Sequence, residues 1–215
     1  MRINIVSGDA MAQYGSELGF KNYISFAESM VSGPVTNEVP FSQGFMQERA
    51  KANGIGFDKY RKRFQSLLKL RSGDDVHVYF GEDLFCQLNL ITLFAYLEKA
   101  GIPTVTYHVI FEDKMQETAL IENVETAGYG DLYKAVLVNH NILATPLEIT
   151  NKALLLYSDY LDNNGILAGL IKANPEDSVL QLSVKIIKQM PEYGLGDVQC
   201  AEVIKRVRAT AEQAE

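Results

Sequence analysis

Acidic residues follow three apolar segments that have the alternation of β-strands. They lie in the turns Gly8-Asp9, Glu28-Ser29 and Gly81-Glu82-Asp83. Parallel strands end at the same edge of a sheet, and the ligands of open α/β sheets bind in the crevice outside that edge. We therefore expect the three turns to line one crevice that binds a small molecule or a metal ion.

Three carboxylates are the candidate metal ligands, namely Asp9, Glu28 and Asp83. Carboxylates that converge could hold Mg²⁺, which prefers oxygen ligands and keeps several of its waters. One of the three could instead act as a general base if its neighbours raise its pKa. The alternative is helix capping, because an Asp at a helix start accepts hydrogen bonds from free backbone N–H groups. Both interpretations stay open for each acid.

Two amides, Gln87 and Asn89, interrupt a helical segment that is apolar almost all round. Gln87 lies four residues after Asp83, so the two share a helix face. Gln87 could orient Asp83 or contact a ligand, or it could be a buried amide satisfied by the protein. Asn89 lies on another face, where we expect it to anchor the helix to a neighbouring segment.

Other motifs carry weaker signals. The spacings of dinucleotide-binding and P-loop motifs are missing from the sequence. The tripeptide Ser32-Gly33-Pro34 could form a phosphate-contacting loop, although such a sequence is more often a plain turn. His77 and His108 stand inside predicted strands without metal-ligand spacing, so zinc is not expected. The basic face of the segment Asp58–Arg71 could contact an anion, but a solvated helix face is the commoner explanation.

Strand and helix patterns alternate over the first part of the chain. The predicted strands are Arg2–Ser7, Asn22–Ala27, Val76–Phe80, Thr104–Ile110 and Ala119–Val124. The predicted helices between them are Ala10–Leu18, Phe41–Asn53, Asp58–Arg71 with Asp58 as its cap, and the apolar helix after Asp83. This alternation predicts an α/β fold with an open, mostly parallel sheet and helices on both faces.

Only helical patterns continue after Gly130. They cover Asp131–Asn139, Pro146–Leu161, Gly165–Ala173, Glu176–Gln189 and Val198–Arg208. We therefore expect an α/β domain over residues 1–127 and an all-helical C-terminal region over residues 128–215. The second region has enough apolar residues to need cover, so we expect it to pack on the first.

Composition narrows the classes of partner. The 215 residues carry a formal net charge of −7, which argues against a nucleic-acid backbone binder, since such a protein needs a basic face. No apolar run approaches the length of a membrane helix, and the N-terminus has the pattern of a strand and not of a signal peptide. Two distant cysteines form no disulfide framework, so we expect a cytoplasmic protein. Neither nucleic acid nor membrane is an expected partner.

Four motifs, in order, resemble the bacterial domain-of-unknown-function 1835 family. They are INIVSGDA, FAESMVSGPV, FMQER and VHVYFGEDLFCQLNL, and they span about Arg2 to Ile110. The resemblance implies a Rossmann-like α/β domain and carries no established activity. It marks these positions as candidate ligand-binding residues: Gly8, Asp9, Glu28, Gly33, Pro34, Glu48, Arg49, Glu82, Asp83, Gln87 and Asn89.

Three kinds of function remain open on the sequence alone. One is a small-molecule enzyme that uses the acids with Mg²⁺. Another is a ligand-sensing module that uses the same crevice without chemistry. The last is a protein-interaction module in which the apolar helix and the C-terminal region form a homo-oligomer.

Overall fold

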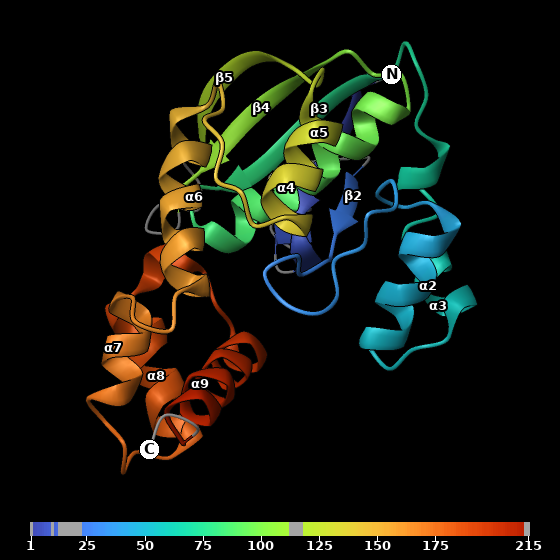
Figure 1. Ribbon diagram of the computed structural model, residues 1–215. Coiled ribbons are helices and arrows are strands. Elements are labelled where there is room, and N and C mark those ends of the chain that lie inside the picture. Colours follow the sequence, from blue (N-terminus) through green and yellow to red (C-terminus); the bar gives the residue numbers. More distant parts are fainter. Residues whose placement is uncertain (1, 10, 13–22, 112–117, 213–215) are drawn as a thin grey trace. The chain divides into compact units, whose positions relative to one another are not determined.

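A five-stranded open sheet forms the centre of the first part of the chain (Figure 1). The computed structural model describes residues 2–9, 11, 12, 23–111 and 118–212. The strands are β1 Arg2–Ser7, β2 Tyr23–Phe26, β3 Asp75–Gly81, β4 Thr104–Ile110 and β5 Thr118–Glu125. Their order is β2-β1-β3-β4-β5, and only β5 is antiparallel to its neighbour. The predicted open, mostly parallel α/β sheet is confirmed.

Helices, turns and loops connect the strands, and helices follow the last strand. The helices are α2 Gln43–Ala52, α3 Phe57–Arg63, α4 Leu84–Lys99, α5 Tyr129–Tyr133, α6 Glu148–Leu161, α7 Ile166–Lys172, α8 Val179–Gln189 and α9 Asp197–Glu212, with the short 3₁₀ turns η1 Leu67–Lys69 and η4 Pro191–Tyr193 and the π-helical turn η3 Lys134–Val138. The helical C-terminal region is thus also confirmed. Most of the predicted helix Ala10–Leu18 lies outside the described residues.

The strand register separates the side chains onto two faces of the sheet. Ile5 pairs with Val78 and Val78 pairs with Tyr107, and these three buried side chains share one face. Val6 and Tyr79 belong to the other face, because successive residues of a strand point to opposite sides. An apolar cluster covers part of that second face: Val6, Met11, Ala12, Tyr79 and Ile110.

Helix α4 is buried almost all round because different elements cover its different sides (Figure 1). The Phe94 ring stands perpendicular to that of Tyr107 on the sheet, with 6.4 Å between ring centroids. The same ring meets Tyr129 of α5 at 4.8 Å. Farther along the helix, Tyr96 packs edge-on against Phe41 at 5.4 Å. The sequence therefore has no polar stripe here because no side of the helix faces water.

The predicted helix over Asp58–Arg71 is wrong as a single element. The structure divides it into α3 and η1, with Phe64 as the C-cap of α3 in a non-helical conformation. Asp58 is not the cap: Gly56 takes the N-cap position, without a side-chain cap bond, and Asp58 lies in the first turn. An acid in the first turn still favours the helix, because it faces the positive end of the helix dipole.

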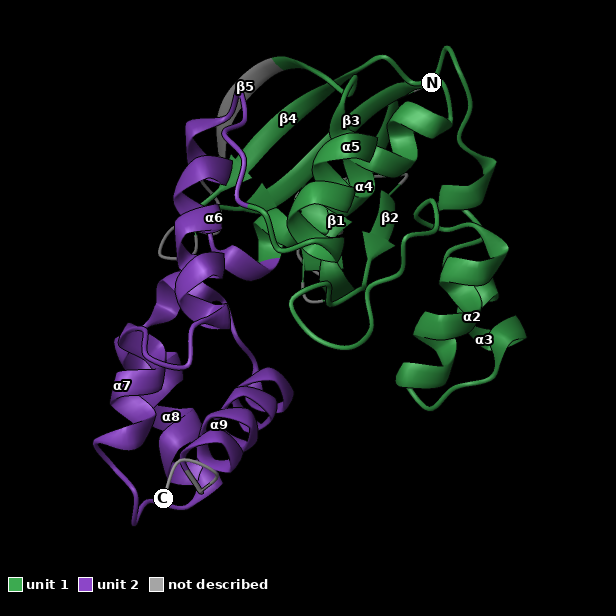
Figure 2. Cartoon of the chain, viewed as in Figure 1, with its two compact units in different colours: residues 1–82, 86–141 green, residues 83–85, 142–215 purple. Residues whose placement is uncertain are grey.

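The chain forms two compact units (Figure 2). Unit 1 comprises residues 1–82 and 86–141, and unit 2 comprises residues 83–85 and 142–215. Helix α5 belongs to unit 1 because Glu98 of α4 accepts hydrogen bonds from the backbone N–H groups of Gly128 and Gly130, at 2.8 and 2.7 Å. The change of composition near Gly128 therefore comes before the division between the units.

Unit 2 is built from helices α6 to α9. Helix α8 begins with a capping box, in which Ser178 accepts from the backbone N–H of Gln181 and the Gln181 side chain accepts from the backbone N–H of Ser178. Asp159 of α6 accepts hydrogen bonds from the first N–H groups of α7, at Ile166 and Leu167. The hydrogen bond that Asp159 accepts from the Tyr193 hydroxyl at 2.6 Å, together with these backbone contacts, lowers the pKa of Asp159 despite its partial burial.

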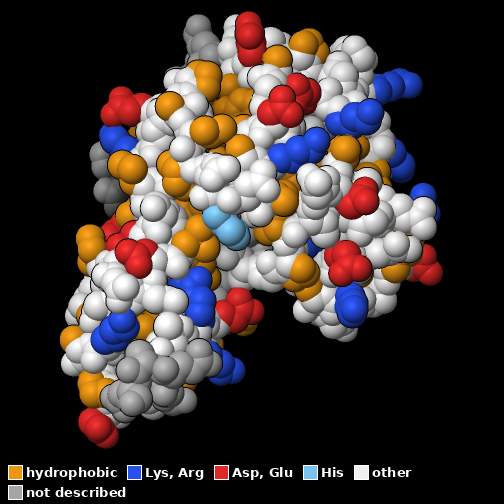
Figure 3. All heavy atoms as spheres, viewed as in Figure 1, with side chains coloured by type: hydrophobic (Ala, Val, Ile, Leu, Met, Phe, Trp, Pro, Cys, Tyr) orange, Lys and Arg blue, Asp and Glu red, His pale blue; other side chains and the backbone are white. Residues whose placement is uncertain are grey.

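On the molecular face in Figure 3, basic and acidic side chains are interspersed among apolar atoms. Among the described residues, no helix is both long enough and apolar enough to span a membrane.

Candidate functional site

The direction of the chain connections reverses between β1 and β3. From β1 the chain goes to β2 on one side, and from β3 it goes to β4 on the other. Open α/β sheets bind ligands at such a point, outside the carboxyl ends of the strands. Here Ser7 ends β1 and Gly81 ends β3, and the Ser7 Oγ lies 3.4 Å from the Cys86 Sγ of α4.

Asp9 carries an exposed but oriented carboxylate at this edge. The preceding Gly8 has φ +78°, which favours glycine, and no atom lies within 4 Å of the position a Cβ would take. Asp9 Oδ1 accepts a hydrogen bond from Ser25 Oγ at 2.6 Å, and its Oδ2 pairs with Arg63 Nη2 at 3.0 Å. The side chain nevertheless stays 72% exposed, so the carboxylate is fixed in direction and open to solvent.

Glu28, the acid after β2, is buried and has both oxygens engaged by the protein. Arg49 Nη2 donates to its Oε1 at 2.5 Å, and the Tyr60 hydroxyl donates to its Oε2. Both side chains of the ion pair are only 2% exposed. Burial raises the pKa of the Tyr60 hydroxyl above its ordinary value, and the neighbouring Glu28 carboxylate adds to this rise.

Arg49 holds the loop after β2 through backbone carbonyls. Its Nη1 donates to the carbonyls of Ser32 and Pro34 at 2.9 and 3.2 Å, and its Nη2 donates to the carbonyl of Ser29 at 2.8 Å. Gly33 has φ +76°, and a Cβ there would lie only 3.0 Å from Arg49 Nη1. The motifs around Glu28, Gly33, Pro34 and Arg49 thus meet in one cluster, which we call the loop clamp; Glu28 and Arg49 are buried in it, whereas Gly33 and Pro34 are exposed.

The two amides of α4 are both satisfied inside unit 1. Asn89 Nδ2 donates to the Glu28 carbonyl at 2.8 Å, and its Oδ1 accepts from the Met30 N–H at 2.9 Å. Asn89 therefore anchors α4 to the loop after β2, which confirms the prediction for it. Gln87 Nε2 donates to the Gly81 carbonyl at 2.6 Å and to the Tyr107 hydroxyl at 2.8 Å. These contacts make Gln87 a support for the end of β3.

The three remaining candidate ligand-binding residues, Glu48, Glu82 and Asp83, differ in burial. Glu48 and Glu82 are exposed, and Glu48 adjoins Arg49 in the chain without sharing its burial. Asp83 is buried and falls in unit 2, where a Cβ added at Gly194 would overlap its carboxylate. Among the described side chains, no three His, Cys, Asp or Glu residues gather as a metal site would require. Magnesium at Asp9, Glu28 and Asp83 stays a prediction.

The sequence did not single out Ser25, Tyr60 or Arg63 as parts of the site. Tyr60 lies within the predicted helix Asp58–Arg71. A signal existed, because a buried tyrosine hydroxyl usually has a hydrogen-bond partner. Arg63 was one of several cations on a helix, and its spacing gave no hint of a partner 54 positions earlier in the chain.

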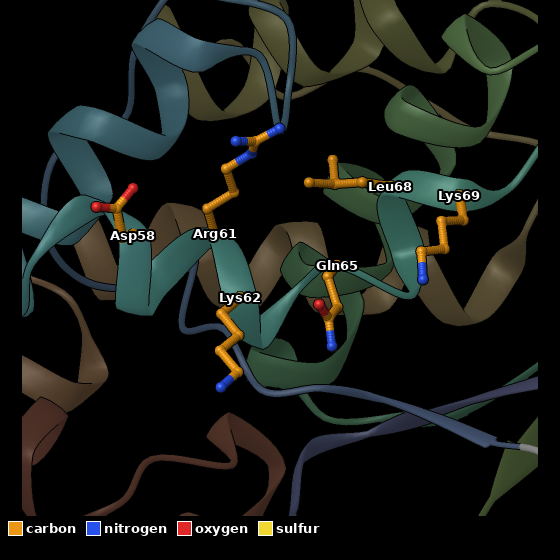
Figure 4. A pocket seen from close by; sticks show the side chains of 6 residues that line it. All are labelled: Asp58, Arg61, Lys62, Gln65, Leu68 and Lys69. Carbon is orange, nitrogen blue, oxygen red and sulfur yellow. The ribbon is translucent and has the colours of Figure 1, made fainter.

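A hollow of about 400 Å³ lies against the α3–η1 segment (Figure 4). Its lining consists of Asp58, Arg61, Lys62, Gln65, Leu68 and Lys69. Three of the six side chains are cationic and one is acidic. This is the basic face of Asp58–Arg71 that the sequence pointed to.

Two histidines form a stack on the sheet. His77 Nδ1 and His108 Nε2 lie 3.0 Å apart, and the Tyr79 ring stacks on His108 with 4.3 Å between centroids. Burial lowers the pKa of His77, and it lowers that of His108 to about 4, with His77 and Arg2 adding to the effect. Both histidines stand inside strands, as expected, His77 in β3 and His108 in β4.

Comparison with known proteins found no match among protein-family models and none among curated proteins.

Proposed function

We propose that the chain binds a polar small molecule at the carboxyl edge of its sheet, between the ends of β1 and β3. The observation that carries this proposal is the Asp9 carboxylate, which is 72% exposed yet held at both oxygens by Ser25 and Arg63. A carboxylate has about four acceptor sites, so two remain for a ligand. An acceptor fixed in advance binds at a smaller entropic cost than a free side chain.

The chemistry of Asp9 selects the class of ligand. An ionised carboxylate only accepts hydrogen bonds, so the ligand presents hydroxyl, amine or ammonium donors. The loop clamp holds the segment that follows the neighbouring strand β2. Arg49 fixes the backbone of this segment, and Glu28 fixes Arg49. Glu28 is therefore proposed as a positioning residue, whereas Asp9 contacts the ligand.

Two coarser proposals accompany this one. The four motifs that led to the domain-of-unknown-function 1835 family support a distant relationship to it. Cys86 and Cys200 are both buried and form no disulfide in the described part of the chain, which supports a reducing, cytoplasmic compartment.

The test is fragment screening by NMR on the ¹⁵N-labelled full chain, with a library of polyols, amines and sugars. We expect hits to shift the backbone amide signals of Gly8, Asp9, Gly81 and Glu82. Asp9→Asn should weaken the best hit by about tenfold, which corresponds to about 1.4 kcal/mol. The same samples, followed over time, show whether any ligand is turned over.

The matched control is Asp131→Asn, the same charge change at an exposed acid of α5. It should leave binding unchanged. Hits that shift signals elsewhere, or equal weakening by both variants, would disprove a site at Asp9. A library without any hit at this edge would count against the proposal as well.

A further inference from the structure

The α3–η1 segment concentrates positive charge on a chain that is negative overall. Residues 57–71 hold six Lys or Arg side chains and one acid, Asp58, whereas the whole chain has a net charge of −7. Of the six cations, Arg63 pairs with Asp9 on the side of the sheet edge. The hollow faces a different set, made of Arg61, Lys62 and Lys69.

These three cations have no ion-pair partner within the described part of the chain, and all three are exposed. Figure 4 shows Arg61 and Lys62 projecting from α3 in different directions and Lys69 projecting from η1, and all three residues line the hollow. The hollow exists because the chain breaks at Phe64 and continues as η1, so α3 does not run on as a straight helix.

The size and lining of the hollow suit a small anion that carries an organic group. Its volume of about 400 Å³ lies within the range of about 300–1,000 Å³ that is common for ligand pockets. Leu68 adds an apolar surface and Gln65 adds amide donors and an acceptor. Asp58 can accept hydrogen bonds from hydroxyl groups at the rim.

We propose that this hollow binds a phosphate monoester of a small hydroxylated molecule. A phosphate monoester carries a charge of about −1.5 to −2 at neutral pH, which matches a group of two to three cations. The planar guanidinium of Arg61 can bind two phosphate oxygens at once. The flexible side chains of Lys62 and Lys69 let their ammonium groups reach the third phosphate oxygen. The hydroxylated part lies against Leu68, Gln65 and Asp58.

The experiment uses the full chain and ribose 5-phosphate as the probe, with ribose and inorganic phosphate as partial probes. Isothermal titration at about 0.15 M salt should show saturable binding of ribose 5-phosphate. Ribose should not bind, and inorganic phosphate should bind more weakly. Amide signals of residues 58–69 should shift in a parallel NMR titration.

Charge deletions locate the site. The double variant Arg61→Gln/Lys62→Gln should raise the dissociation constant at least tenfold, and Lys69→Gln should raise it by a smaller factor. Lys59→Gln is the matched control, because Lys59 is an exposed cation of the same helix that does not line the hollow. It should change binding less than twofold.

Three results would overturn the proposal. One is the absence of saturable binding of ribose 5-phosphate up to about 10 mM. Another is an equal loss of affinity in Lys59→Gln, which would indicate unspecific attraction to a basic helix. The third is binding of a single-stranded RNA oligonucleotide more tightly than the monoester, which would identify a nucleic-acid surface. In the NMR titration the signals of Gly8, Gly81 and Glu82 should not shift with ribose 5-phosphate, so this site and the one at the sheet edge are tested separately.

Discussion

Arg49 is a charged side chain that is almost completely removed from solvent, with 2% of its surface exposed. Its charge is neutralised by Glu28, and its terminal nitrogens donate to three backbone carbonyls. Removing one member of a buried ion pair leaves the other charge unpaired in a medium of low polarity, which costs about 3–5 kcal/mol.

Arg49→Ala should therefore lower the free energy of unfolding by about 3–5 kcal/mol, measured by urea denaturation. Lys51→Ala, two residues away on the exposed side of α2, should change it by less than about 0.5 kcal/mol. A loss below about 1 kcal/mol for Arg49→Ala would contradict the burial of this pair.

From the stacked histidines we predict how the free energy of unfolding depends on pH. Burial lowers the pKa of His77, and that of His108 to about 4, whereas an unfolded histidine titrates near about 6.5. Between these values the unfolded chain binds more protons than the folded one, so the free energy of unfolding falls as the pH falls. Well above pH 6.5, where both histidines are neutral in the folded and in the unfolded chain, the pair does not change stability with pH.

Urea denaturation at several pH values between about 6.5 and 5 should show this slope in the wild type, above the range in which most carboxyl groups titrate. The double variant His77→Gln/His108→Gln should have a flatter profile. His140→Gln, a change at an exposed histidine, should keep the wild-type slope. Parallel profiles for the wild type and the double variant would show that the stack does not control proton binding.

The sequence predicted part of the residue-level site. Glu28 and Arg49 were selected by resemblance of short motifs, and they do meet in one cluster. The hydrogen bonds of Tyr60 with Glu28 and of Ser25 with Asp9 could not be predicted. Local periodicity carries no information about which hydroxyl meets which carboxylate across the fold.

At the scale of elements, the bounds of a strand were predicted correctly where its residues follow one clear pattern of hydrophobic periodicity. The bounds of β1 and β4 agree with the expected segments because β-branched and apolar residues alternate through them. The break between α3 and η1 was missed because Phe57, Tyr60, Phe64 and Leu67 keep helical spacing across it. Core contacts there, such as that between the rings of Phe64 and Phe41 at 4.9 Å, outweigh the helical preference.

A glycine with positive φ in a turn allows a prediction about the stability of one element. Gly194, which caps η4 in unit 2, has φ +60°, and a Cβ there would overlap the Asp83 carboxylate. Gly194→Ala adds this overlap to the cost of a left-handed backbone, so it should lower the free energy of unfolding by more than about 2 kcal/mol.

Gly101→Ala is the matched control, because Gly101 also has positive φ, +73°, but its nearest atom would be at an ordinary 3.7 Å. It should cost only about 1–2 kcal/mol in the same urea experiment. Equal losses for the two variants would mean that Asp83 moves aside freely.

For the whole molecule, composition changes near Gly128, whereas the two compact units divide after residue 141. Gly128 marks the end of strand patterns, yet Tyr129 and Tyr133 of α5 are buried with unit 1. Composition distinguishes helices from strands and cannot show which unit a helix joins. The expected packing of the helical region on the α/β domain, and a homo-oligomer, stay predictions.

Limited proteolysis tests the division into units. Residues 139–144 are exposed and outside regular elements, and Leu143 is 47% exposed. Brief chymotrypsin digestion should therefore cut after Leu143, and mass spectrometry should find fragments 1–143 and 144–215. Cleavage near Gly128 should be slow, because Glu98 holds the backbone on both sides of Tyr129. Early cleavage at Tyr129 would contradict this.

The loop clamp has a consequence for how this protein can change. Arg49 recognises the loop after β2 by its carbonyl oxygens, which every amino acid possesses. The backbone path is therefore independent of most side chains that the loop carries, apart from Gly33 with its positive φ. A position such as Val35, which is partly exposed, is free to be exchanged. The segment can acquire new recognition properties by substitution without losing its shape, which makes it a natural site for library design.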